Sequence, residues 1–253
     1  MFTKIKTPSE IKNMRTSGQM LAKILHLLQH NTKAGMSTKD LANLASAELK
    51  SLGGEPAFLG FGGFPDVLCV SLNDEVVHGI PKPRRLINSG DIVSVDFGVI
   101  YNGMITDAAL SFTVGKATPE LQELVKITEE SLYAGINVVK NGVKTGDIGH
   151  AVEKVLNKHH YGVVRDLVGH GVGHHLHEDP NVPNYGFPGS GVSLSKGMTI
   201  AIEPMATLGS KSVFMANDGW TIKTVDGSNS AHFEHTVLIS EDHAEILTAY
   251  SPA

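Results

Sequence analysis

The sequence contains one cysteine and no long apolar run. Because Cys69 stands alone, a disulfide bond within the chain is excluded. No stretch approaches the roughly 18 apolar residues of a membrane-spanning helix. Residues 1–6 also lack the apolar core and the small-residue cleavage site of a secretory signal. These absences predict a cytoplasmic protein with no membrane partner.

Positive charge is scarce as well. The chain has 21 Lys and Arg against 26 Asp and Glu, which gives a formal net charge of −5. A broad nucleic-acid surface needs a basic excess, so we expect no direct nucleic-acid partner. The 253 residues, 41% hydrophobic and 19% charged, are typical of a soluble globular protein and long enough for one domain with a large core.

Helix and strand signals are interspersed along the chain, which predicts an α/β fold. Thr7-Pro8-Ser9-Glu10 has the pattern of a capping box, and apolar residues recur after it at helical spacing as far as Leu28. Further helices are predicted at 38–52, from 118 to about 140, and from 145 to about 159. Strand patterns occupy 67–71, 92–97, 199–203 and 236–239.

Two parts of the chain resemble each other at one fixed offset. Gly35–Leu41 resembles Gly142–Ile148, and the offset is 142 − 35 = 107 residues. Asp96 and Glu203 both stand six residues after a glycine, and 203 − 96 is again 107. Gly-x-x-Thr-x-Asp could be a common turn-and-cap pattern, but the shared offset favours a duplication into two α/β halves.

Two acidic residues interrupt the strand patterns. Alternation within 92–97 places Asp96 on the face opposite the apolar residues, and alternation within 199–203 does the same for Glu203. A carboxylate on a buried strand is costly unless it is paired or bound to metal. For either acid alone, a solvent-facing position on a half-exposed sheet is the simpler interpretation.

More candidate ligands change that balance. Asn102-Gly103 is a hairpin signal between Asp96 and Asp107, so the turn can bring both carboxylates to one end of the hairpin. Three further candidates follow along the chain: His170, Glu203 and Glu234. This oxygen-rich set suits a pair of Mn, Fe(II), Co or Zn ions better than a structural zinc, which favours cysteine. Four carboxylates carry −4, which two divalent cations would balance.

Four motifs resemble the type I methionine aminopeptidases, and the resemblance extends over nearly the whole chain. They are NDEVVHGIP at Asn73–Pro81, GHGVGHHLHEDP at Gly169–Pro180, AIEPM at Ala201–Met205 and HFEHT at His232–Thr236. The resemblance implies the pita-bread fold, in which a pseudo-twofold antiparallel sheet flanked by helices surrounds a central di-metal site. It would form a single catalytic domain, residues 1–253, with halves at roughly 1–115 and 116–253. The implied activity is hydrolysis of the bond after the initiator methionine, with a small second residue preferred.

The resemblance also assigns roles to particular residues. It implies metal ligands at Asp96, Asp107, His170, Glu203 and Glu234. Glu203 would also act as general base or proton shuttle, His78 would contact the scissile amide, and His177 would polarise its carbonyl.

A methionine pocket is implied at Phe58, Phe61, Phe64, Cys69, Leu176 and Trp220. Many members of the family carry tyrosine near Phe61 and Phe64 and an aromatic residue at position 176. This chain should therefore have a drier pocket, which leaves the fine specificity open.

The implied partners are the N-termini of nascent polypeptides. The enzyme would act on them at the ribosome, and it would do so as a monomer. The implied cofactors are two divalent ions (Co, Mn, Fe(II) or Zn) and a monovalent cation held by backbone carbonyls near Asn73 and Ser230.

Two alternatives stay open. One is a relative of the same fold that cleaves X-Pro bonds; such enzymes usually carry a large N-terminal domain, whereas the first helix here is expected to begin just after Thr7. The other is a non-catalytic binding module, which would have no need of five competent ligand residues.

Overall fold

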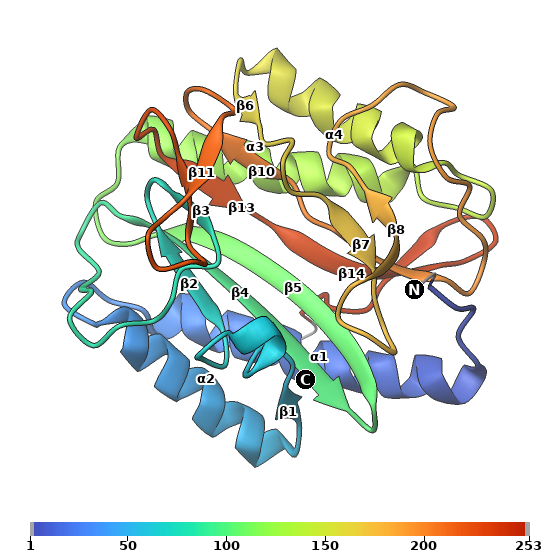
Figure 1. Ribbon diagram of the computed structural model, residues 1–253, viewed down its shortest axis with the longest axis horizontal. Helices are drawn as coiled ribbons and strands as arrows, with labels where there is room; N and C mark the ends of the chain where they lie inside the picture. The colour runs from blue at the N-terminus through green and yellow to red at the C-terminus, as the bar shows by residue number, and fades with distance from the viewer. Residues whose placement is uncertain (1–2, 251–253) are drawn as a thin grey trace.

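The computed structural model of the chain describes residues 3–250. Residues 1–2 and 251–253 lie outside the described part. The prediction that residues 1–6 contain no secretory signal therefore falls partly outside it. Two pairs of helices border a layer of strands: α1 (Pro8–Asn31) and α2 (Thr38–Leu52) lie along one margin, and α3 (Pro119–Asn137) and α4 (Thr145–Lys158) along the opposite one (Figure 1). No helix between residues 3 and 250 is long and apolar enough to cross a membrane.

Local sequence sets most of the helix ends. Thr7 and Glu10 form the predicted capping box at the start of α1, and α2 ends at Gly53, whose φ of 79° is left-handed. The prediction for α3 was too long by three residues. The helix ends at Asn137, after which Val139 N–H donates to Ile136 O at 3.0 Å in a tighter turn and the Val139 side chain, 1% exposed, packs into the core. α4 ends one residue earlier than predicted, at Lys158.

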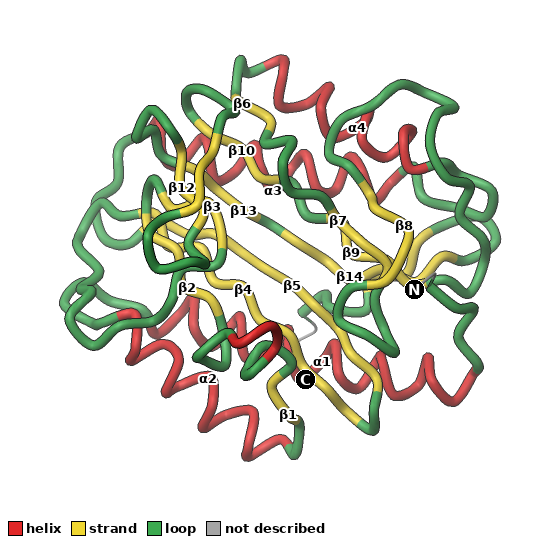
Figure 2. Tube along the Cα trace, in the orientation of Figure 1, coloured by secondary structure: helices red, strands yellow, loops and turns green. Residues whose placement is uncertain are grey.

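The main sheet has nine antiparallel strands, which form a continuous layer between the helix pairs (Figure 2). Their order is β1 (Glu55–Pro56), β4 (Ile92–Tyr101), β5 (Met104–Thr113), β14 (Glu234–Ile239), β9 (Thr199–Ile202), β7 (Gly169–Gly171) and β8 (Glu178–Val182), with β2 (Cys69–Leu72) paired to β4 and β15 (Ala244–Ile246) to β14.

Two three-stranded sheets and one short helix complete the fold. One sheet orders β13 (Ser230–His232), β10 (Met205–Thr207) and β6 (Gly162–Val163), and the other orders β11 (Val213–Met215), β12 (Ile222–Thr224) and β3 (Glu75–Val77). A 3-10 turn, η1, spans Phe61–Gly63.

The β4–β5 hairpin is longer than the predicted strand at 92–97. Asn102 and Gly103 both have positive φ, 48° and 76°, and form a two-residue turn that lets the pairing continue to Tyr101 and Met104. Asp96 and Asp107 therefore lie near the middle of long strands, and their predicted position at one end of the hairpin was wrong.

The predicted alternation holds on both central strands. Val93, Val95 and Phe97 are fully buried in the core beneath α1 and α2, and Ile200 and Ile202 are fully buried in a second core. The opposite face of each strand is thereby left for the acidic residues. The second strand ends at Ile202, so Glu203 lies just beyond it.

Several hydrogen bonds recur at the offset of 107. Gly35 N–H donates to Ile87 O and Gly142 N–H to Leu194 O, both at 2.8 Å. α2 begins at Thr38 and α4 at Thr145, and 145 − 38 = 107. β4 and β9 begin at residues 92 and 199, again 107 apart. These matches support the proposal of two duplicated halves.

Candidate metal centre

Strand pairing brings the acidic residues together. Asp96 pairs with Ala109, and Asp107 pairs with Gly98, so the two carboxylates point from the same face of the hairpin as diagonal neighbours. Glu234 begins β14 opposite the same Ala109. On the other side of β14, His235 pairs with Ile202, which places Glu203 beside Glu234.

His170 reaches this group from β7. Its Nδ1 lies 2.9 Å from Gly171 O, which fits an N–H donated from Nδ1 and leaves the lone pair on Nε2 free. Nε2 lies 3.5 Å from Glu203 Oε1. Asp107, His170 and Glu234 each offer one ligand atom within 4.8 Å of the others, so this buried group could hold a metal ion.

The carboxylates lack cationic partners of their own. Asp96 Oδ1, Asp107 Oδ1 and Glu234 Oε1 are buried and make no hydrogen bond with any residue in 3–250. The residues that line the surrounding cavity include no lysine or arginine. Oxygen atoms of this kind are the ligands that divalent cations prefer, so the residues present fit a metal ion.

The pKa values of the acids reflect this arrangement. Burial raises the pKa of Asp107 to about 7. Burial, with added repulsion from neighbouring carboxylates, raises the pKa values of Asp96, Glu203 and Glu234 well above their usual range. In contrast, burial lowers the pKa of His170 to about 3, which keeps its ring neutral and able to bind metal.

All thirteen residues singled out from the sequence line one cavity of about 90 Å³. One wall carries the five candidate ligands, and the remainder is largely apolar. Phe64 and Trp220 pack edge to face with ring centroids 5.2 Å apart. Gly98 leaves room for Phe58, because a Cβ there would lie 2.7 Å from the Phe58 ring. Phe61 is 45% exposed, so it lies at the rim rather than in the wall.

Cys69 belongs to the wall by packing. Burial raises the pKa of its thiol well above the usual value, and the nearby carboxylates add to the rise. The side chain is therefore a neutral thiol, which is a weak nucleophile.

Two histidines stand between the ligands and the apolar wall. His177 is exposed at the rim, with its ring 4.4 Å from His170 and 5.2 Å from Phe61. His78 has a positive φ of 60°, which is uncommon outside glycine. Burial, with a contribution from His177, lowers the pKa of His78 to about 4; the His177 ring is exposed on one side, but desolvation where it packs against His170 and Phe61 still lowers its pKa. Both rings are thus neutral near pH 7 and can donate one hydrogen bond each.

His232 was not singled out from the sequence, although it lies in the motif HFEHT. It is 1% exposed, and its Nε2 lies 3.9 Å from Glu203 Oε2. Neither ring nitrogen has a hydrogen-bond partner in the described chain. Asn184 was also missed; its Nδ2 donates to Glu203 O at 3.0 Å and fixes the backbone of that residue.

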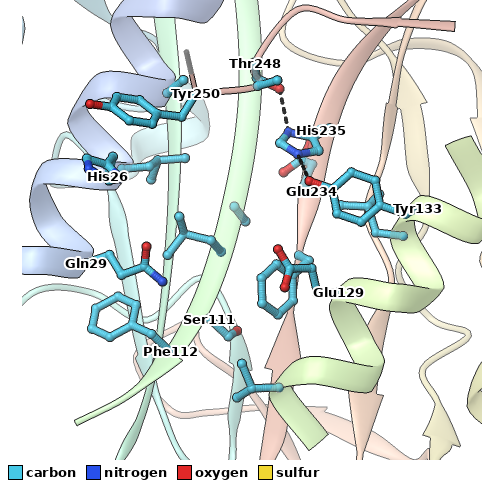
Figure 3. Close-up of a pocket in the computed structure, with 18 of the residues that line it drawn as sticks. His26, Gln29, Ser111, Phe112, Glu129, Tyr133, Glu234, His235, Thr248 and Tyr250 are labelled. Carbon is cyan, nitrogen blue, oxygen red and sulfur yellow. Dashed lines mark hydrogen bonds between the residues drawn. The ribbon is translucent and has the colours of Figure 1, made fainter. Parts of the chain in front are cut away.

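A larger cavity of about 720 Å³ lies between α1 and α3 (Figure 3). His235, which follows Glu234, points into it, with Nδ1 2.9 Å from Thr248 Oγ1. Glu129 and Glu234 are the acidic residues of its lining, so no carboxylate cluster forms there. Its volume is larger, but the groups able to perform chemistry converge on the smaller cavity.

Comparisons with known proteins agree with this geometry. Residues 12–241 match the model of metallopeptidase family M24. The methionine aminopeptidase of Clostridium acetobutylicum is 45% identical over 96% of this chain and 98% of its own, and methionine aminopeptidase 1 of Bacillus subtilis is 44% identical over 96% and 98%. The crystal structure of methionine aminopeptidase from Thermotoga maritima superposes with a TM-score of 0.96 at 47% identity, covering 98% of this chain and all of that one.

A prolidase shares the fold at a greater distance. Prolidase from Pyrococcus furiosus has a TM-score of 0.79 at 24% identity, and the match covers 66% of that chain. This likeness extends to the fold alone, whereas the identities above extend over whole chains. The pita-bread fold implied by the sequence motifs is thereby confirmed, and the chain belongs to the methionine aminopeptidases of metallopeptidase family M24.

Proposed function

We propose that this enzyme hydrolyses the peptide bond after an N-terminal methionine, with two divalent ions held by Asp96, Asp107, His170, Glu203 and Glu234. The observation that carries the proposal is the set of buried carboxylate oxygens without partners, directly beside an apolar cavity. A neutral apolar wall suits a thioether side chain, which packs well against aromatic edges. The carboxylates on the other wall suit the cations that an aminopeptidase requires.

The protein groups have separate tasks in this reaction. Bound divalent ions would supply Lewis acidity and lower the pKa of water. Glu203, whose carboxylate faces His170 and His232, would accept the proton from water and pass it to the leaving amine. His78 and His177 would donate hydrogen bonds to the scissile group as negative charge develops on its oxygen. The apolar wall would hold the methionine side chain and exclude water.

The two metal positions should differ. Asp107, His170 and Glu234 form one compact group, while Asp96 and Glu203 extend it on either side. The imidazole is therefore available to one ion and not to the other. We expect a titration of metal-free protein with Mn²⁺ to show two unequal binding steps, and one ion or two identical steps would contradict this part of the proposal.

The proposal also covers the substrate, the location and oligomeric state of the enzyme, and a monovalent cation. The substrates would be the N-termini of nascent chains with a small second residue. The enzyme would act on them at the ribosome, in the cytoplasm, as a monomer. A monovalent cation would bind near Asn73, whose carbonyl lies 2.8 Å from Ser230 N and whose φ is 58°. Ser230 Oγ lies 3.1 Å from both Asn73 O and Glu75 O, so two backbone oxygens lie close together at this point, which supports a site built from backbone oxygens.

A peptide assay tests the function directly. The metal-loaded enzyme should release methionine from Met-Ala-Ser and leave Ala-Pro peptides uncleaved, and activity should disappear with a chelator and return with Mn²⁺. A preference for the proline substrate would favour the X-Pro alternative. Metal binding without hydrolysis of either peptide would favour a binding module.

A further inference from the structure

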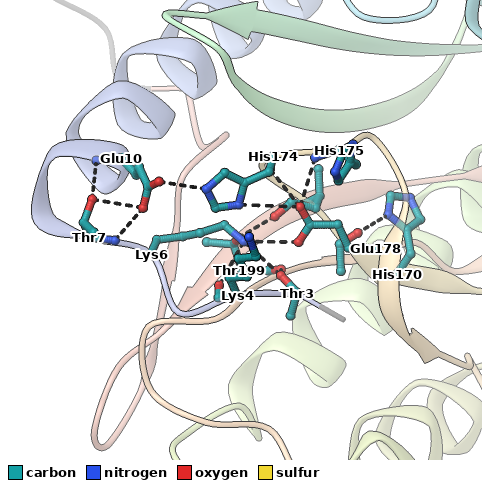
Figure 4. A network of polar contacts seen from close by, with 12 residues as sticks. Thr3, Lys4, Lys6, Thr7, Glu10, His170, His174, His175, Glu178 and Thr199 are labelled. Carbon is teal, nitrogen blue, oxygen red and sulfur yellow. Dashed lines mark hydrogen bonds and ion pairs between the residues drawn. The ribbon is translucent and has the colours of Figure 1, made fainter. Parts of the chain in front are cut away.

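The loop that carries His177 is held by a buried carboxylate. Residues 172–177 connect β7 to β8, and Glu178 is the first residue of β8. Glu178 Oε1 accepts hydrogen bonds from the backbone N–H groups of His174 at 2.8 Å and His175 at 2.9 Å (Figure 4). One side chain thus fixes the turn that leads directly into Leu176 and His177.

The charge of this carboxylate is balanced from the other end of the chain. Lys6 Nζ lies 3.2 Å from Glu178 Oε2, and the two side chains are 0% and 2% exposed. Lys6 Nζ also donates to Thr3 Oγ1 at 2.9 Å and to Lys4 O at 3.0 Å, so all three ammonium protons have acceptors. A buried ion pair with complete hydrogen bonding is stable, but removal of one partner leaves an uncompensated charge.

The backbone of residues 3–6 is also hydrogen-bonded to the chain close to Glu178. Thr3 N–H donates to Asp179 O at 2.5 Å, and Lys6 N–H donates to Gly197 O at 2.8 Å. The segment therefore lies across the start of β8 and the turn before β9 (Figure 4). Burial alone would raise the pKa of Glu178, but hydrogen bonds from Thr3 and His175 and the charge of Lys6 outweigh it and lower the pKa.

A second contact joins α1 to the same loop. Glu10 Oε2 accepts from Thr7 N–H at 2.7 Å in the capping box, while Glu10 Oε1 lies 2.7 Å from His174 Nε2. Gly173 O accepts from Ile105 N–H at 2.7 Å, which ties the loop to β5 as well. The loop is thus held on three sides, and its remaining side, with Leu176 and His177, faces the candidate metal centre.

We propose that Lys6 and Glu178 are positioning residues for catalysis: Glu178 holds the 174–177 turn so that His177 faces the scissile group, and Lys6 balances its charge. This inference rests on the function proposed for His177 above. Neither residue lines the cavity that holds the candidate metal ligands. Their effect on the reaction would pass through the placement of the His177 ring, for which a displacement of about 1 Å can cost roughly 100-fold in rate.

The test compares five proteins: wild type, Lys6→Met, the charge-neutral double variant Lys6→Met/Glu178→Gln, His177→Ala, and Arg15→Met as control. Arg15 pairs with Glu245 at 2.6 Å on the surface of the same N-terminal region, so its loss removes an ion pair between distant parts of the chain without touching Glu178. Each protein is loaded with Mn²⁺ and assayed for methionine release, metal content and thermal unfolding.

We expect Lys6→Met to lower kcat about 10- to 100-fold, with KM changed less than about threefold and metal content unchanged. The double variant should recover kcat to within about fivefold of wild type, since the amide oxygen of the introduced glutamine still accepts the two backbone hydrogen bonds and carries no unpaired charge. Arg15→Met should match wild type.

Other outcomes overturn the inference. Unchanged kcat in Lys6→Met would do so, and so would a parallel loss of activity and metal, which indicates a structural role alone. If Lys6→Met does not fold, the double variant decides: recovered kcat supports the inference, and a folded, metal-loaded but inactive double variant contradicts it. Wild type and His177→Ala are assayed in parallel. Absence of methionine release by wild type would refute the proposed function itself, whereas full activity in His177→Ala beside an active wild type would refute only the positioning role.

Discussion

The buried carboxylates near His177 form two groups, Glu178 by itself and the candidate metal ligands, and each group meets the cost of burial differently. Glu178 is paired with Lys6 and accepts two backbone hydrogen bonds, and its pKa is lowered. Asp107 and Glu234, in the neighbouring group, have oxygen atoms without partners and raised pKa values. The chain supplies a cation to the first group and none to the second. The second group is thus the one suited to cations from outside the chain.

The largest expected loss of activity comes from a change among the candidate metal ligands, the carboxylate group to which the chain supplies no cation. Asp107→Asn removes one charge of the compact ligand group and should lower kcat/KM on Met-Ala-Ser by on the order of 10³-fold, beyond the 10- to 100-fold typical of residues that only support ligands. Added Mn²⁺ should not restore it. Asp242→Asn, at an exposed carboxylate beside His243, is the control and should keep full activity. Full activity in Asp107→Asn would end the metal-ligand assignment.

The next prediction concerns the stability of the metal-free protein, in which the two groups should respond with opposite sign. Glu178→Gln leaves Lys6 buried without a counter-charge and should lower the free energy of unfolding by about 3–5 kcal/mol. Glu234→Gln removes repulsion among acids and should raise it by about 1–2 kcal/mol while abolishing activity. Denaturant unfolding of both variants at pH 8 with a chelator measures the difference, and a shared sign would remove the contrast between the groups.

The sequence predicted much of this arrangement because local patterns specify it. Alternation along the strands separates core residues from Asp96 and Glu203, and Asn102-Gly103 specifies the turn that brings Asp96 and Asp107 together. The four family motifs contain six of the thirteen residues that line the cavity, namely His78, His170, Leu176, His177, Glu203 and Glu234.

The remaining features depend on contacts between distant segments. Lys6 and Glu178 are 172 residues apart, and no periodicity links a lysine in an N-terminal segment to a glutamate after a histidine. The length of β4 followed from pairing with β5 beyond residue 97, which a six-residue alternation did not indicate. His232 became a candidate only when folding buried it against Glu203. Such contacts arise from tertiary packing, on which a single sequence carries little information.

Binding of metal should depend on pH, with a sign set by the raised pKa values. Below about pH 7 the carboxyl of Asp107 holds a proton in the metal-free protein, and a divalent ion must displace it. The proton-bound form also favours the metal-free fold, a contribution that is lost as pH rises through about 7. Affinity for Mn²⁺ should therefore increase about thirtyfold from pH 5.5 to pH 8 for this one group. His170 contributes no such dependence, because its pKa of about 3 lies below this range.

Calorimetric titration at the two pH values checks this prediction, and proton release on binding at pH 6 provides an independent measurement. A Glu178→Gln variant that binds metal should keep the same pH dependence, since the carboxyl of Glu178 does not belong to the ligand group. A constant affinity across the range would mean that the acids are ionised before metal arrives. The contrast between the two carboxylate groups would then be lost.

The smallest expected effect concerns His232, and it tests whether a neighbouring side chain orients one of the candidate metal ligands. His232 is buried with Nε2 3.9 Å from Glu203 Oε2, which is outside hydrogen-bond distance but close enough for a small shift of the carboxylate to form that bond, and we expect the bond to orient Glu203 when metal is bound. His232→Leu should lower kcat roughly tenfold and weaken metal binding to a similar degree, whereas His232→Gln, which keeps a hydrogen-bond donor, should lose less. His159→Leu, at a partly exposed helix end, is the matched control. Equal losses in His232→Leu and His232→Gln would show that ring packing, rather than a hydrogen bond to Glu203, accounts for the effect. In that case Glu203 would depend on the metal and on Asn184 alone for its orientation, and the contrast with the fully supported Glu178 would be sharper.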